Sequence, residues 1–464
     1  MDRDPVICRR TTSERSMSTV PAAVPRPQAH PLGVLLRTSR DVLGTLRALH
    51  DECGDVAFVD LPFVPTLIFA HPEAIHTVLV KDFRSYRKDN LTRQLRRILG
   101  DGLLTAEGER WRRHRRLAQP GFHHEAIQGY ADVMVRTADA VTGAWGERTE
   151  LDVHHEMMRL TLDIVSRTLF GHDIGADAAL VADRLDRLMD TSRGVANTGF
   201  LLPQWVPSRQ NARHASAVAD LDRVVYRIIE AHRRQPDQRT LLGMLLAATD
   251  AEGGLTDVEL RDEAITLLMA GHETTAAALT FALYLLSQHP NAEAELHAEL
   301  DALPAAPGLA DLPRLPYTRA VVLEAMRLYP PAWSVGREAL VDTAVGDVPV
   351  PRGTQVWLSP WLTQRDPRWF DAPEAFVPER WLGGELERAL PDGAYFPFSA
   401  GPRVCIGKRF AELEAVLVLA AIGRRYALRL RPGETLRLDT AVTLRPRGGL
   451  AMTATARAAV RHAA

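Results

Sequence analysis

Hydrophobic positions follow two periods along the chain, and each period predicts a different kind of structure. Strand-like runs at 56–61 and 66–70 surround two prolines, which predicts a hairpin at the edge of a sheet. From about residue 106 to 328, apolar residues recur at i, i+3 and i+4, as they do in helices packed on a core. After Pro330 the pattern predicts short strands, one further helix and a final strand region, at 344–350, 355–358, 407–422 and 436–452. The expected fold is therefore mainly α with a smaller β lobe.

The longest predicted helix begins after Thr256 and continues to Ser287. Thr256 and Glu259 have the spacing of a capping box, in which a hydroxyl and a carboxylate satisfy two backbone N–H groups at the helix start. Pro290 supplies the stop. Such a helix would be roughly 50 Å long, which is enough to cross a whole domain.

The composition fits one large globular domain. The chain has 464 residues, of which 46% are hydrophobic and 25% are charged. Its formal net charge of −2 argues against a nucleic-acid binder, which normally carries a basic excess. Because no repeat, linker or sharp change in composition marks a boundary, we expect a flexible segment at 1–30 and a single domain at 31–464.

The cysteine content indicates a reducing compartment. Three cysteines, Cys8, Cys53 and Cys405, are too few for a disulfide framework, and the odd count leaves a thiol available for chemistry. The N-terminus lacks the apolar run of a signal peptide, and the longest apolar stretches, 276–286 and 415–422, are too short to span a bilayer. We therefore expect a cytoplasmic protein with no membrane span.

Residues 398–407, FSAGPRVCIG, carry the strongest chemical signal. They place one cysteine in a loop rich in Gly and Pro, just before an apolar helix. The N-terminus of a helix favours thiolate, which is the ligand that a soft metal or haem iron requires. Gly401 and Gly407 would let a flat cofactor approach the backbone. A buried core cysteine is the commoner alternative, and zinc is disfavoured because no second Cys or His lies at ligand spacing.

This loop resembles the haem-binding signature of the cytochrome P-450 monooxygenases, F-x-x-G-x-R-x-C-x-G, in Phe398, Gly401, Arg403, Cys405 and Gly407. Four further segments of the family occur in the expected order: WRRHR at 111–115, AGHETT at 270–275, EAMR at 324–327 and PERW at 378–381. The resemblance implies the P-450 fold, haem b with Cys405 as axial thiolate ligand, and insertion of one oxygen atom from dioxygen into a substrate.

A polar cluster interrupts the apolar interior of the longest predicted helix. The resemblance places Gly271, Glu273 and Thr274 above the haem, where Gly271 would leave room for dioxygen and substrate. Thr274 would hydrogen-bond dioxygen, and Glu273 would relay protons to it. A threonine bonded back to its own helix and a glutamate on a solvated face are the alternatives.

The family also implies roles for several charged residues. Haem propionates need charge-assisted donors, and the positions that match the family's contacts are Trp111, Arg115, Arg337 and Arg403. His114 lies between matched positions, and we expect it to be exposed.

Glu324 and Arg327 stand at i, i+3, so they can pair on one helix face. The family adds Arg380 and gives the three a structural role. An ordinary surface ion pair is the alternative. The sequence departs from many relatives at Gln364, where they have His, and at Trp381, where Phe is commoner.

The implied electron donors are a ferredoxin and its reductase, because the chain has no Gly-rich flavin or nicotinamide fingerprint. A basic surface on the cysteine side of the haem would attract an acidic donor. Its candidate residues are Arg110, Arg112, Arg113, Arg116, Lys408 and Arg409, although runs of charge are often only solvated faces.

The expected substrate is a hydrophobic small molecule, because the regions expected to line the pocket carry few charges. The pocket candidates are Leu99, Leu103, Phe200, Leu201, Ala270, Ala332, Trp333 and Val335. The stretch at 201–213 is similar to bacterial members that oxidise terpenes, so a terpenoid ranks before a fatty acid or a macrolide or other polyketide. Two remote alternatives are a non-haem iron oxygenase, on the H-x-E triplets at 123–125 and 154–156, and a haem-binding sensor.

Overall fold

The computed structural model describes residues 20, 23–61, 64–171, 177, 180–185, 187–188, 206–303 and 307–458. Phe200 and Leu201, two of the predicted pocket residues, lie outside this range. The predicted division of the chain at residue 30 stays a prediction.

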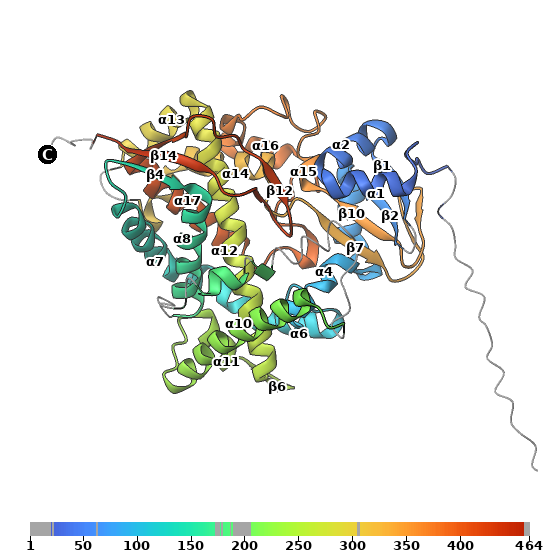
Figure 1. Cartoon of the computed structure of the whole chain (residues 1–464), viewed down its shortest axis with the longest axis horizontal. Helices are drawn as coiled ribbons and strands as arrows, with labels where there is room; N and C mark the ends of the chain where they lie inside the picture. Colours follow the sequence, from blue (N-terminus) through green and yellow to red (C-terminus); the bar gives the residue numbers. More distant parts are fainter. Residues whose placement is uncertain are drawn as a thin grey trace, which may run out of the picture.

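Helix α12 (Asp257–Gln288) crosses the middle of the molecule (Figure 1). Its capping box is present as predicted, since the Glu259 N–H donates to the Thr256 hydroxyl and the Glu259 carboxylate accepts from the Thr256 N–H. Side chains are buried on nearly every side of α12, which is the pattern of a helix enclosed by others. The helices packed against it include α8 (Val153–Leu169), α10 (Arg209–Arg234), α14 (Pro316–Leu328) and α17 (Lys408–Arg425).

The other helices that the structure describes cover this arrangement. They are α1 (Pro31–Arg40), α2 (Val42–Cys53), α3 (Pro72–His76), α4 (Asn90–Gln94), α5 (Arg96–Leu99), α6 (Gly108–Ala118), α7 (His124–Gly143), α11 (Leu241–Ala247), α13 (Pro290–Asp301), α15 (Pro360–Thr363) and α16 (Glu385–Ala389). Two short helical turns matter for the site, η1 (Thr77–Lys81) and η5 (Pro378–Gly384). Within the described part of the chain, no helix has the length and apolar character to cross a membrane.

The largest sheet lies with α1 and α2 on one side of the molecule (Figure 1). Its order is β1 (Val56–Leu61), β2 (Val64–Phe69), β10 (Gln355–Leu358), β7 (Val335–Ala339) and β3 (Tyr86–Lys88). All neighbours are antiparallel except β2 and β10. The predicted hairpin is confirmed as β1–β2. Of its two strands, β1 lies at the edge of the sheet and β2 lies inside it. The sequence pattern missed β7, because its interior holds Gly336, Arg337 and Glu338 instead of apolar residues.

A three-stranded sheet of β11 (Tyr426–Leu430), β14 (Ala451–Ala456) and β4 (Arg148–Asp152) lies with the helices. Among the described residues, three hairpins complete the β structure: β5 (Thr249–Asp250) with β6 (Gly253–Gly254), β8 (Thr343–Val345) with β9 (Val348–Val350), and β12 (Leu438–Thr440) with β13 (Leu444–Pro446). The strand predicted at 344–350 is therefore wrong, because the chain turns back at Gly346 with φ +57°. The predicted class, mainly α with a smaller β lobe, is confirmed.

Candidate active site

A cavity of about 380 Å³ lies between the middle of α12, helix α6, strand β7 and the loop that leads into α17. Its wall includes four of the predicted pocket residues, Leu103, Ala270, Ala332 and Val335. Most of the remaining wall is apolar as well, with Leu104, Phe122, Leu267, Met269, Ala278 and Val442. The polar and charged wall residues include residues of the cysteine loop and α12, and also of strands β3 and β7 and of the segment before β13.

Two predicted pocket residues face elsewhere. Leu99 is fully buried in the helical core and is not part of the cavity wall. Trp333 packs against a different cluster, and its indole N–H donates to the Ala441 carbonyl at 3.3 Å. Both predictions were wrong because apolar character cannot distinguish a side chain that faces a cavity from one that faces the core.

Cys405 lines the cavity, and its side chain is accessible there. Its N–H donates to the Phe398 carbonyl at 3.0 Å, which closes the loop, and Phe398 also lines the cavity. Burial raises the pKa of Cys405, and the Gly407 N–H and the Arg115 guanidinium counter only part of the shift. The helix N-terminus alone therefore does not make this thiol acidic, contrary to the sequence argument.

The two glycines of the loop have different structural roles. Gly401 has φ +68°, and a Cβ added there would lie 2.1 Å from the Leu79 carbonyl oxygen of η1. Gly401 is thus required by backbone packing, and the predicted reason, access for a flat cofactor, was wrong for it. A Cβ on Gly407 would lie 4.0 Å from the Cys405 sulfur, so Gly407 borders the cavity directly.

Four cationic side chains converge on the cavity: Lys88, Arg115, Arg337 and Arg403. Arg115 donates to the Val404 carbonyl at 2.8 Å, and Arg337 donates to the Gly336 carbonyl at 2.8 Å. Arg403 pairs with Glu107 and lies 4.5 Å from the ring centroid of Trp111, which also lines the cavity.

The crowding of these cations perturbs their acidity. Burial and the nearby Arg403 lower the pKa of Arg337 to about 10. Burial, reinforced by Arg337 and Arg403, lowers the pKa of Lys88 to about 7. Sequence reasoning missed Lys88, because it stands on the short strand β3 outside any of the family motifs. An anionic ligand in this part of the cavity would relieve the repulsion.

The predicted polar cluster of α12 also lines the cavity. Glu273 is buried, and its Oε1 accepts from the Thr443 hydroxyl at 2.7 Å and from the Arg445 guanidinium at 3.3 Å. Thr274 is partly accessible from the cavity, and its hydroxyl donates to the Ala270 carbonyl at 2.6 Å. Glu273 is therefore not on a solvated face, whereas the alternative of a back-bonded threonine does describe the geometry of Thr274.

Gly271 has a packing role in addition to its place at the cavity. A Cβ added there would lie 3.0 Å from a methyl group of Val165 on α8. The glycine therefore permits the close approach of α8 and α12, while its backbone borders the cavity.

Glu324, Arg327 and Arg380 are brought together in a fully enclosed array between α14 and η5. Arg327 donates to both oxygens of Glu324 at 2.8 Å, and Arg380 donates to Oε1 at 3.2 Å. Neither Glu324 nor Arg327 has any exposed surface, so the surface ion pair is excluded. Arg327 also donates to the carbonyls of Gln364, Pro373 and Ala375.

Both departures from the family pattern have a place in this array. The Trp381 indole N–H donates to Glu324 Oε2 at 2.8 Å, a bond that the commoner Phe cannot make. The Gln364 amide donates to the carbonyls of Met326 and Arg327 and accepts from the Phe396 N–H. Each departure therefore adds hydrogen bonds to the scaffold.

Comparison with known proteins decides the family. Residues 25–450 match the family described as Cytochrome P450. The chain belongs to the cytochrome P450 family. It is similar to cyclooctatin synthase of Streptomyces melanosporofaciens, at 39% identity over 83% of this chain and 85% of that protein.

Two further relatives carry names that state an oxygenase activity. Cyclooctat-9-en-7-ol 5-monooxygenase of Streptomyces melanosporofaciens is 36% identical over 90% of this chain and 91% of its own length. Pentalenene oxygenase of Streptomyces avermitilis is 33% identical over 83% of this chain and 86% of its own length. The solved structure of the cytochrome P450DA heme domain superposes with a TM-score of 0.83 at 27% identity, covering 94% of this chain and 98% of that one.

As a cytochrome P450, the protein is a monooxygenase that binds haem b with a cysteine thiolate as axial ligand. The residues around the cavity fit this cofactor. The cysteine sulfur is accessible from the cavity, and the four cations that line it, of which Lys88, Arg337 and Arg403 repel one another, suit the two propionate carboxylates of haem b. The non-haem iron oxygenase and the haem-binding sensor are excluded. His154, in one of the H-x-E triplets, is buried with Nδ1 3.4 Å from the Thr280 hydroxyl.

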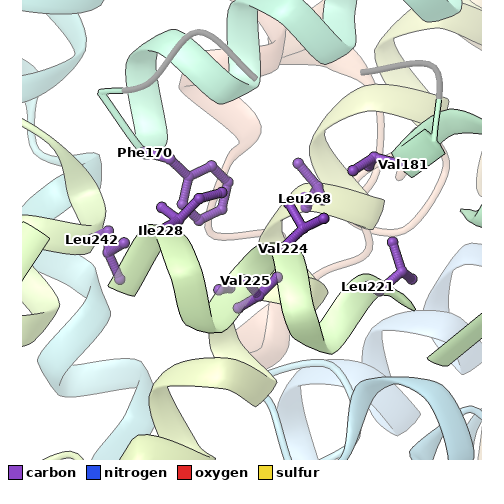
Figure 2. A pocket seen from close by; sticks show the side chains of 9 residues that line it. Phe170, Val181, Leu221, Val224, Val225, Ile228, Leu242 and Leu268 are labelled. Carbon is purple, nitrogen blue, oxygen red and sulfur yellow. The ribbon is translucent and has the colours of Figure 1, made fainter. Parts of the chain in front are cut away.

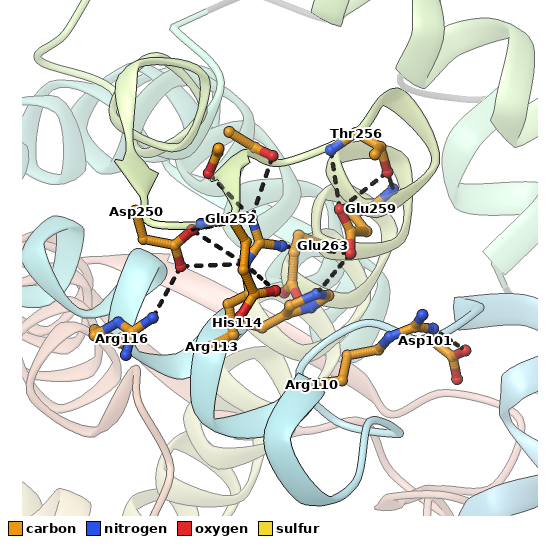
Figure 3. Close-up of polar contacts among 12 residues, drawn as sticks. Asp101, Arg110, Arg113, His114, Arg116, Asp250, Glu252, Thr256, Glu259 and Glu263 are labelled. Carbon is orange, nitrogen blue, oxygen red and sulfur yellow. Dashed lines mark hydrogen bonds and ion pairs between the residues drawn. The ribbon is translucent and has the colours of Figure 1, made fainter.

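His114 of this P450 is fully buried, so the prediction that it is exposed was wrong. Figure 3 shows its ring between two carboxylates of α12, with Nδ1 2.7 Å from Glu263 and Nε2 3.4 Å from Glu259. Burial disfavours the charged ring, but these two carboxylates outweigh it and raise the pKa of His114. The histidine therefore fastens α6 to α12.

The predicted basic surface is largely neutralised. Arg113 and Arg116 both pair with Asp250 on the β5–β6 hairpin, as Figure 3 shows. Arg110, Arg112 and Lys408 also have acidic partners, which are Asp101, Glu109 and Glu412. The run of like charges was misleading because Asp250 is distant in the chain, while Glu109 and Glu412 pair with Arg112 and Lys408 within one helical turn.

A second residue that sequence reasoning missed is Glu414 on α17. Its carboxyl oxygens are buried and have no hydrogen-bond partner among the described residues. Burial raises the pKa of Glu414 well above its usual range. The signal in the sequence is a glutamate directly before the apolar run at 415–422.

Other potential sites in the described residues carry no ligand chemistry. A pocket lined by Phe170, Val181 and apolar residues of α10, α11 and α12 (Figure 2) has a volume of about 10 Å³, which is room for about one water molecule. His50, Asp55 and Asp366 lie within metal-ligand distance of one another, but Arg368 pairs with both carboxylates.

Proposed function

We propose that this P450 hydroxylates a terpenoid within the cavity that Cys405, Glu273 and Thr274 all line. The convergence of these residues on one mostly apolar cavity is the observation that carries the proposal. Cys405 offers a ligand for iron, Glu273 and Thr274 offer groups that exchange protons, and the apolar part of the wall suits a hydrocarbon skeleton.

Cys405 is the proposed iron ligand, since it is the cysteine whose sulfur is accessible from the cavity. Trp111, Arg115, Arg337 and Arg403 are the proposed propionate contacts, and the cation of Lys88 joins them. When bound, the haem supplies the activation of dioxygen, and the thiolate assists cleavage of the O–O bond. Phe398 and Gly407, which line the cavity with Cys405, would help to hold the cofactor.

The chain's own residues control the protons. Glu273 holds a proton-exchanging carboxylate at the cavity wall, and the Thr274 hydroxyl beside it can donate either to Ala270 or into the cavity. Rotation of this hydroxyl toward the cavity would orient a proton next to the reacting oxygen. Gly271 has no side chain, so the backbone of α12 next to this pair stays accessible from the cavity.

The substrate class is supported by the relatives and by the cavity wall. Their names state activity on cyclooctat-9-en-7-ol and on pentalenene. Leu103, Ala270, Ala332 and Val335 present small or branched apolar groups, which suit a compact polycyclic skeleton. The cations in the described part of the wall are all assigned to the propionates, so the carboxylate of a fatty acid has no separate anchor.

The proposed electron source is a ferredoxin with its reductase, in the reducing compartment of the cytoplasm. The low cysteine count supports that compartment. Because most of the expected basic surface is neutralised, docking of the donor would depend less on salt than a strongly basic face implies.

A substrate titration tests the proposal. The holoprotein is titrated with cyclooctat-9-en-7-ol, pentalenene, a long-chain fatty acid and a macrolide, while the haem spin state is followed by absorption. We expect the spin state to shift with a terpenoid, and a hydroxylated product to form when ferredoxin, reductase, NADPH and dioxygen are added. A shift and product with the fatty acid or the macrolide alone would overturn the substrate assignment.

A further inference from the structure

The C-terminal hairpin β12–β13 reaches α12 at the level of Glu273. Thr443 precedes β13 and donates its hydroxyl to Glu273 Oε1 at 2.7 Å. Arg445, within β13, lies 3.3 Å from the same oxygen, and its Nε lies 3.4 Å from Asp439 on β12. These four residues are at least nine-tenths buried, so the array forms inside the protein and not at its surface.

The hairpin is fixed in place by backbone contacts beside the cavity. The Leu444 N–H donates to the Pro331 carbonyl at 2.8 Å, and the Trp333 indole N–H donates to the Ala441 carbonyl at 3.3 Å. Val442 and Thr443, between these two anchors, line the cavity. The groups that hold Glu273 therefore belong to a braced segment of the cavity wall.

Arg445 supplies a positive charge in this part of the core. Its neighbour His154 on α8 has a pKa of about 4, lowered first by burial and then by the charge of Arg445. That ring is therefore neutral near pH 7 and adds no positive charge to the array. Because an ionised carboxylate is strongly disfavoured in the core unless it is paired, the hydrogen bond from Arg445 favours the ionised form of Glu273.

We propose that Thr443 and Arg445 are positioning residues for Glu273, which fix its Oε1 at the cavity wall and keep the carboxylate ionised between turnovers. Asp439 in turn orients the Arg445 guanidinium. The inference rests on the proposed role of Glu273 in proton exchange, because it names the groups that set the resting state of that acid. Neither Thr443 nor Arg445 belongs to a motif through which the sequence resembles the family.

Infrared difference spectroscopy of the substrate-free holoprotein across a pH titration tests this inference without any turnover. The Glu273→Gln variant identifies the carboxyl band of Glu273 by its disappearance. In Arg445→Gln we expect the midpoint for protonation of Glu273 to rise by about 1–3 pH units, as expected when an opposite charge within hydrogen-bond range is removed. Arg445→Lys should return the midpoint most of the way to its wild-type pH. Arg437→Gln, at an exposed position next to the same hairpin, should leave the midpoint unchanged.

Thr443→Val supplies an independent arm that keeps the array's charges intact. Loss of the hydroxyl donor should shift the frequency of the Glu273 band, whereas Thr443→Ser should return it to the wild-type position. Identical midpoints in wild type and Arg445→Gln, or an unshifted band in Thr443→Val, would overturn the inference. Because the experiment measures no substrate or product, its result can be interpreted even if the proposed substrate class is wrong.

Discussion

Two buried carboxylates of this P450, Glu324 and Glu273, stand in contrasting surroundings. Glu324 accepts five hydrogen bonds, from Arg327, Arg380, Trp381 and a backbone N–H, and it has no exposed surface. Glu273 also faces an arginine, but at 3.3 Å, and it borders the cavity.

The difference teaches how one chemical group serves two purposes in the same fold. A carboxylate whose lone pairs are all engaged cannot move or change its charge without breaking the array, which suits a structural fastening. A carboxylate held from one side and open to a cavity can exchange a proton, which suits chemistry. The comparison therefore predicts that changes at Glu324 affect stability first and changes at Glu273 affect turnover first.

The largest expected effect is that of Glu324→Gln. The substitution keeps the shape but leaves Arg327 and Arg380 without a buried negative charge, so the free energy of unfolding should fall by about 3–5 kcal/mol. Urea unfolding and haem content measure the loss. Glu387→Gln is the matched control, since its partner Arg319 is largely exposed and the loss should stay within about 1 kcal/mol. Equal losses in the two variants would contradict the account.

Glu273→Gln should act on turnover. We expect product formation to fall by about 100-fold, in the range of a lost general acid or base. The free energy of unfolding should fall by less than in Glu324→Gln, because Arg445 keeps Asp439 as a partner. Product analysis with the terpenoid that shifts the spin state, together with urea unfolding, checks both parts. A large stability loss with normal turnover would reverse the assignment of the two carboxylates.

Trp381→Phe sharpens the structural side of the comparison. It removes one donor to a charged carboxylate, so the free energy of unfolding should fall by about 1.5–3 kcal/mol with turnover unchanged. Trp369→Phe is the control, because the Trp369 indole N–H has no hydrogen-bond partner among the described residues. If both variants lose the same stability, the bond to Glu324 contributes nothing measurable.

Thr274→Ala should give the smallest effect on stability and a specific effect on coupling. We expect hydrogen peroxide release to rise and product per NADPH to fall several-fold, while the free energy of unfolding changes by about 0.5 kcal/mol or less. Thr280→Ala removes the same kind of back-bond, to the Ala276 carbonyl, at a fully buried position on the same helix. Uncoupling in both variants would mean that the effect comes from the helix and not from the cavity.

Structural features that depend on residues close together in the chain could be predicted from the sequence. The ends of α12 follow from a capping box and a proline, and the cysteine loop follows from a ten-residue motif. The pairing of Glu324 with Arg327 follows from their i, i+3 spacing, and the addition of Arg380 came only from the family resemblance.

Features that depend on distant residues escaped the sequence. His114 stands among arginines, so it was expected at the surface, yet its partner Glu263 is 149 positions away. Strand β7 was missed because Arg337 faces the cavity and Glu338 pairs with two arginines, which hydrophobic periodicity cannot register. Lys88 and Arg445 escaped for the same reason, since only tertiary packing places them beside the cavity and Glu273.

The central claim is that Cys405 binds the haem iron as a thiolate, and the absorption spectrum of the reduced, carbon monoxide-treated protein tests it most directly. We expect the red-shifted band of a thiolate-bound haem in the wild type, and no such band in Cys405→Ala purified alongside it. A wild-type spectrum without the red-shifted band, or the same red-shifted band in Cys405→Ala, would contradict the account.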